Sequence, residues 1–135
     1  MGNLADESGT DVEIYRRAFT PNVIHVVSRS DASEELLVLL DSLGLERKTE
    51  ETDGPAYVWH ETPEGLSEAA QKALATRAAL PLMIANYDIN IDPDVYDVTA
   101  WAQAMYEHRS AQAQAAGAPG LPPPGPAGPK PPRSR

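Results

Sequence analysis

Apolar residues recur along the chain in patterns that predict both strands and helices. The segment 23–28 (VIHVVS) places apolar residues on both sides of an extended chain. A strand that is apolar on both faces is typical of the centre of a sheet. The partly alternating segment 12–19 (VEIYRRAF) predicts another strand before it, and the turn residues 20–22 (TPN) separate the two.

The segment 31–45 (DASEELLVLLDSLGL) predicts an amphipathic helix. Its leucines repeat at the spacing of one helix face: Leu36, Leu40 and Leu43. We expect Asp31 to cap the amino end of this helix and Glu34 to complete a capping box. Gly44 stands where helices often end in the left-handed conformation.

Two further strands are predicted over 46–52 and 56–61. Asp53 and Gly54 lie between them, and this dipeptide is a strong signal for a hairpin turn. The first arm is almost entirely polar, so we expect it to be an edge strand whose charges discourage further pairing.

An alanine-rich helix is predicted to follow, with Thr62 as its cap and Pro63 as its first residue. Its inner side is expected to carry Leu66, Ala70, Ala73 and Leu74. Pro81 lacks the N–H that a helix interior requires, so a kink or a new start is expected there.

The acidic stretch 87–97 (YDINIDPDVYD) raises the question of a calcium loop. Counted from Asp88, its first, third and fifth positions carry oxygen ligands: Asp88, Asn90 and Asp92. A calcium loop also requires glycine at position 6 and glutamate at position 12, which are Pro93 and Thr99 here. The preferred interpretation is therefore a short strand followed by a capped helix start, and weak divalent-cation binding is the alternative.

A final amphipathic helix is predicted from about residue 98 to residue 116. Its apolar residues have helical spacing: Val98, Trp101, Ala102 and Met105. The resulting order β-β-α-β-β-α-(β)-α predicts an α+β fold, with a small, mainly antiparallel sheet covered on one face by helices.

Composition predicts three parts: a flexible leader (1–10), a single α+β domain (11–116) and a disordered, basic Pro/Gly-rich tail (117–135). The tail holds eight of the thirteen prolines and cannot bury enough apolar area to fold. We interpret it as a solubilising or tethering segment, with a specific ligand for proline-reading domains as the alternative.

The chain has no cysteine, no signal-peptide pattern and no run approaching the ~20 apolar residues of a membrane span. These absences predict a soluble cytoplasmic protein without disulfides. All 20 acidic residues precede residue 117, together with 8 basic residues, so residues 1–116 carry a formal charge of −12. Such a body repels a phosphate backbone, which disfavours nucleic-acid binding.

Candidate chemistry is sparse. His25 and His60 lie on neighbouring predicted strands, and with Glu61 they are the residues most suited to hold a metal ion. If His25 simply lies on the core side of its strand, it is a hydrogen-bonded structural histidine. The chain has no nucleophile elbow, P-loop or dinucleotide-binding motif. We therefore predict no catalytic residue and no cofactor, and favour a protein that is not an enzyme.

The phrases YVWHETPEGL (57–66) and NYDINIDPDVYD (86–97), together with heavy use of alanine and proline, resemble short uncharacterised proteins of high-GC actinobacteria. The resemblance implies a soluble bacterial protein. It implies no activity and no site residue.

The leading hypothesis is an acidic, non-enzymatic binding or regulatory module that contacts a basic protein partner or a second copy of itself. Tyr15, Trp101 and Tyr106 are its candidate anchors, because they lie in terminal elements. A small-ligand or metal-binding domain using His25 and His60 is the alternative, and a nucleic-acid-associated regulator is a further one.

Overall fold

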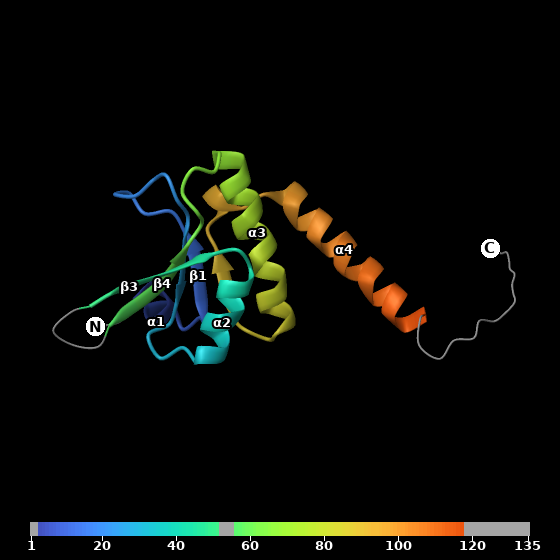
Figure 1. Cartoon of the computed structure of the whole chain (residues 1–135), viewed down its shortest axis with the longest axis horizontal. Helices are drawn as coiled ribbons and strands as arrows, with labels where there is room; N and C mark the ends of the chain where they lie inside the picture. The colour runs from blue at the N-terminus through green and yellow to red at the C-terminus, as the bar shows by residue number, and fades with distance from the viewer. Residues whose placement is uncertain (1–2, 52–55, 118–135) are drawn as a thin grey trace, which may run out of the picture. The chain divides into compact units, whose positions relative to one another are not determined.

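The computed structural model describes residues 3–51 and 56–117 (Figure 1). The chain forms two compact units, Met1–Ala102 and Gln103–Arg135. The hairpin turn predicted at Asp53 and Gly54, and the tail from residue 118 onward, lie outside the described residues. The predicted division of the chain at residues 10 and 116 stays a prediction.

The first unit contains a five-stranded sheet in the order β3-β4-β2-β1-β5. Its strands are β1 (Val12–Tyr15), β2 (His25–Ser28), β3 (Glu46–Glu50), β4 (Tyr57–Glu61) and β5 (Ile89–Ile91). Among the described strands, three pairings are antiparallel and the pairing of β1 with β5 is parallel. The predicted α+β class, the central position of β2 and the edge position of the polar β3 are confirmed.

One face of the sheet packs against α2 (Glu34–Ser42) and α3 (Glu68–Ile84), as Figure 1 shows. The core between them includes Val12, Ile14, Val26, Leu36, Leu40, Ala75, Ala78 and Leu82. Burying a valine, leucine or isoleucine side chain contributes about 1.5–3 kcal/mol. The predicted covering of one sheet face by helices is confirmed, and this apolar core holds the helices on that face.

The predicted amino cap of α2 was wrong. The cap is Ser33, whose hydroxyl accepts a hydrogen bond from a backbone N–H of the first turn, and Glu34 is the first helical residue. Asp31 instead accepts a hydrogen bond from Arg29, with 2.8 Å between Oδ1 and Nε. At the other end, Gly44 has a φ of 89°, which confirms its predicted left-handed conformation.

The predicted start of α3 was also wrong. Thr62 is completely buried, and its N–H donates to the carbonyl of Ile24 over 3.0 Å. Its hydroxyl accepts from the Ile24 N–H over 2.9 Å. Because Thr62 extends the pairing of β2 with β4 in this way, it cannot begin a helix, and Ser67 is the cap of α3.

The buried side of α3 differs from the prediction by about one residue. The residues predicted to face inward are only half-buried, whereas those facing the core are Gln71, Ala75, Thr76, Ala78, Ala79, Leu80 and Leu82. Because alanines occur on all sides of this helix, the sequence pattern does not show which side faces the core. The helix is continuous through Pro81 to Ile84, so no new helix starts at the proline, and the predicted kink stays a prediction.

The acidic stretch adopts the predicted strand and capped turn. After β5, Asp92 accepts a hydrogen bond from the N–H of Asp94 over 3.0 Å and caps the short helix η1 (Pro93–Val95). The structural interpretation of this stretch is confirmed.

Residues 4–8, placed by composition in the leader, form a short helix, α1 (Leu4–Ser8). Asn3 caps it through a capping box, and Ala5 is completely buried. The predicted final helix is α4 (Val98–Gly117). No helix in the described part of the chain is long and apolar enough to cross a membrane.

Candidate functional site

The strand β5 forms one edge of the sheet and has an unoccupied side among the described strands. Its pairing with β1 includes a bond from the Val12 N–H to the Asp88 carbonyl and one from the Asp92 N–H to the Ile14 carbonyl. Backbone groups of successive strand residues point to opposite edges. The N–H and C=O groups of Ile89 and Ile91 therefore point away from β1.

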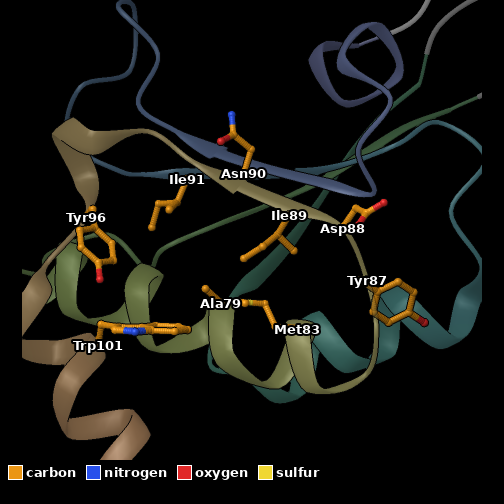
Figure 2. A pocket seen from close by; sticks show the side chains of 9 residues that line it. All are labelled: Ala79, Met83, Tyr87, Asp88, Ile89, Asn90, Ile91, Tyr96 and Trp101. Atoms are coloured by element: carbon orange, nitrogen blue, oxygen red, sulfur yellow. The ribbon is translucent and has the colours of Figure 1, made fainter.

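A groove of about 480 Å³ runs beside this edge. Its lining includes Ala79, Met83, Tyr87, Ile89, Tyr96 and Trp101. Figure 2 shows that these side chains come from α3, from β5, from the start of α4 and from the segments that connect these elements, which carry Tyr87 and Tyr96. The groove is thus bounded by apolar side chains on one side and by an open strand edge on the other.

Several of the apolar side chains around the groove remain accessible to solvent. Met83 is 49% exposed. Tyr96 is 38% exposed. Large apolar side chains grouped in this way differ from the single exposed residues that any protein surface carries, and such groups are typical of interaction sites.

The groove keeps its shape because Thr76 ties α3 to the segment after η1. Thr76 is completely buried, and its hydroxyl accepts a hydrogen bond from the Asp97 N–H over 2.9 Å. The same hydroxyl donates to the Val95 carbonyl over 3.4 Å. Asp97 in turn accepts from the N–H groups of Thr99 and Ala100, which fixes the start of α4 that carries Trp101.

Carboxylates surround the open edge. Asp88 precedes β5 and lines the groove, while Asp92 and Asp94 follow the strand. All three are exposed. A partner that approaches this edge therefore meets negative charge at both ends of the strand.

The opposite face of the sheet holds a second polar cluster around His25. Tyr15 and Glu61 are its cross-strand partners, and side chains directly opposite each other share a face. The imidazole Nε2 lies 3.4 Å from Oε2 of Glu61, and the ring stacks on Tyr15 with 6.3 Å between centroids. Trp59 donates to the same Glu61 oxygen over 2.7 Å.

His60 lies on the helix-covered face instead. Its cross-strand partner is Val26, a core residue, and its Nε2 lies 2.8 Å from Oδ1 of Asp41 on α2. Arg47 binds the same carboxylate through Nε and Nη2. The structure therefore brings His25 and Glu61 together and separates both from His60.

Burial lowers the pKa of both histidines. For His25, loss of solvent is the main cause, and the nearby charge of Arg17 adds to it. For His60, burial again outweighs the opposing effect of its bond to Asp41. Burial thus favours the neutral form of both imidazoles, and the Nδ1 atom of His25 is buried without a hydrogen-bond partner among the described residues.

The positions of His25 and His60 argue against the metal-binding alternative. Within residues 3–51 and 56–117, no group of three His, Asp or Glu side chains is placed to hold a metal ion. The two predicted histidines fail to converge because they occupy adjacent positions in the β2–β4 register and so project from opposite faces.

Of the predicted partner-binding residues, Trp101 lines the groove. Tyr15 is half-buried on the other face of the sheet, against His25. Tyr106 belongs to the second unit and is 73% exposed. Sequence reasoning missed Met83 and Tyr96, although the nearby signal, an apolar run after Pro81 and an acidic stretch with tyrosines at both ends, was visible.

Comparison of the chain with family models, with curated proteins and with solved structures gives no match.

Proposed function

We propose that this protein is a non-enzymatic binding module that takes an extended, basic segment of a partner protein as an added strand beside β5. The observation that carries the proposal is that the open edge strand β5 also lines an apolar groove. Strand addition combines backbone hydrogen bonds, which give affinity, with pockets for alternate side chains, which give specificity.

The backbone contribution comes from Ile89 and Ile91. Each directs one N–H and one C=O away from β1, so the edge can exchange hydrogen bonds with an incoming strand. Each such bond contributes about 0.5–1.5 kcal/mol. That is too little for stable binding alone, so the groove must supply the remainder.

The groove supplies the remaining binding free energy by burying alternate side chains of the bound segment. Every second side chain of an added strand points to the same face as Ile89 and Ile91, and these two pack against the helix-covered core. An aliphatic side chain there would contact Met83 and Trp101. Burying one such side chain adds about 1.5–3 kcal/mol.

Charge selects the partner. Asp88 and Asp92 stand at the two ends of β5, so lysine or arginine flanking the bound strand would be attracted. A second copy using the same strand in antiparallel register would place Asp88 opposite its Asp92, and like charges directly opposite destabilise a pair. A basic partner segment is therefore favoured over pairing of two β5 strands.

The test is a calorimetric titration with a short blocked peptide in which valine alternates with threonine and lysine stands at each end. We expect binding that weakens with salt and that is lost in Met83→Glu. The matched control is Val38→Glu, because Val38 is similarly exposed at 52% but lies on α2. This control should bind the peptide as the wild type does.

Two N-methylated peptides test the strand geometry. One carries methyl groups on the valine nitrogens and the other on the threonine nitrogens. Only one set of N–H groups faces β5 in an added strand, so one peptide should bind like the parent and the other should not. Equal binding by both peptides, or no binding of the parent peptide, would overturn the proposal.

A further inference from the structure

A hydrogen-bonded turn between β1 and β2 presents an exposed aromatic side chain. The N–H of Thr20 donates to the carbonyl of Arg17 over 3.3 Å, which closes a turn around Ala18 and Phe19. Phe19 is 97% exposed. A single exposed apolar side chain is common on protein surfaces, so the way this turn is held and charged decides whether it is suited to contact another molecule.

The base of this turn is held in place by side chains. Arg16 donates through Nη1 to the side-chain oxygen of Gln71 over 2.9 Å and also to the carbonyl of Pro21. Gln71 is buried on α3 and donates to the carbonyl of Asn22 over 2.6 Å. Phe19 therefore projects from an anchored loop, which lowers the entropy cost of binding.

The turn is also basic on an otherwise acidic unit. Arg17 is exposed, and its guanidinium carbon lies 6.0 Å from the ring centre of Tyr15. An aromatic side chain beside a cation complements the groove at β5, where Met83 and Trp101 offer apolar contact and Asp88 offers negative charge.

We infer that the turn of one copy docks into the β5 groove of another, with Phe19 inserted and Arg17 close to Asp88. This inference rests on the proposed groove but uses a turn in place of an added strand, so the backbone of Ile89 and Ile91 is not required. Turn and groove are different surfaces, so the contact is heterologous and joins copies head to tail.

A second copy fits the turn better than an anionic membrane does. Residues 1–116 carry a formal charge of −12, from 20 acidic and 8 basic residues, which repels a negatively charged bilayer. The same charge opposes the approach of a second copy at long range, so contact between copies depends on charges that come close to each other. The groove offers the opposite charge at close range, where screening by salt is incomplete.

Sedimentation velocity of the full chain tests the inference across micromolar concentrations. We expect the wild-type mass to rise beyond that of a dimer, because each copy retains one unused surface. Phe19→Ala and Met83→Glu should each weaken association at least about tenfold, the loss typical of a central anchor. The matched variant Val38→Glu should associate like the wild type. Tyr96→Ala provides a second groove variant.

Mixing the two defective variants gives the decisive result. Phe19→Ala keeps a working groove and Met83→Glu keeps a working turn, so an equimolar mixture should form a heterodimer that grows no further. A monomeric wild type, wild-type association of Phe19→Ala, or a mixture that stays monomeric would overturn the inference.

The peptide titration distinguishes a failure of the self-association inference from a failure of the proposed strand addition. If the wild type stays monomeric and Phe19→Ala still binds the valine–threonine peptide, strand addition stands and self-association is overturned. If copies associate through Phe19 but the peptide does not bind, self-association stands and strand addition is overturned.

Discussion

The imidazole Nε2 of His60 lies 2.8 Å from Oδ1 of Asp41, although His60 itself is completely buried in the sheet. Asp41 is partly exposed on α2. The pair therefore connects the interior of β4 to the outer side of a helix, and it makes the packing of α2 on the sheet sensitive to the protonation of one buried ring.

Stability should fall as the pH is lowered through the range in which free histidine titrates. Burial lowers the pKa of His60 below its ordinary value of 6.5, and Asp41 only partly offsets this effect. Well above pH 6.5 this histidine is neutral in both the folded and the unfolded state. Below it the unfolded state takes up a proton first, so unfolding is favoured.

Urea unfolding at pH 7.5 and pH 5.5 measures this effect. His25 has a pKa shifted in the same direction, so it adds to the same pH dependence. We expect His60→Gln to reduce the difference between the two pH values and His25→Gln to reduce it further. An unchanged difference in the double variant would contradict the assignment.

Much of the fold could be predicted because strong local patterns agreed with the final packing. The strand at 23–28 is apolar on both faces and lies in the centre of the sheet, and the spacing of the leucines in α2 decides which side of that helix is buried. Helix boundaries were harder to predict. Thr62 has the sequence context of a helix cap, but its N–H and its hydroxyl form hydrogen bonds with the backbone of Ile24, 38 positions away in the chain.

The candidate site was harder to predict than the fold. Trp101 was named from its aromatic character, but its place in the groove depends on the hydrogen bonds from Thr76 on α3 to Val95 and Asp97. Threonine within an alanine-rich helix carries no sequence signal for such a contact. The separation of His25 from His60 likewise depends on a register of one residue between β2 and β4.

Replacement of Asp41 should distinguish hydrogen bonding from charge. Asp41→Ala leaves a buried N–H of His60 without an acceptor, and we expect it to lower the free energy of unfolding by about 1–3 kcal/mol. Asp41→Asn keeps an acceptor and loses mainly the exposed ion pair with Arg47, which contributes little to stability, so we expect a smaller loss than in Asp41→Ala. Chemical denaturation of both variants checks this order, and equal losses would contradict it.

Leu82 and Met83 are adjacent on α3, but replacing Leu82 should mainly lower stability, whereas replacing Met83 should mainly weaken peptide binding. Leu82 is completely buried, so Leu82→Ala should lower the free energy of unfolding by about 2–5 kcal/mol. Met83 is half-exposed, so Met83→Ala should change stability by about 0.5 kcal/mol or less. Met83→Ala should nevertheless weaken binding of the valine–threonine peptide. Thermal unfolding and titration of the same samples separate the two effects.

The three predicted aromatic anchors should differ in their effect on peptide binding. Trp101→Ala removes a wall of the groove, and we expect a loss of at least about tenfold in affinity, as is usual for a central tryptophan. Tyr106→Ala alters an exposed residue of the second unit and should leave binding unchanged. Tyr15→Phe keeps the ring stacked on His25, on the face of the sheet away from the groove, and should also leave binding unchanged. Titration of the three variants under one set of conditions checks this order. Loss of binding in Tyr15→Phe with full binding in Trp101→Ala would move the site to the opposite face of the sheet.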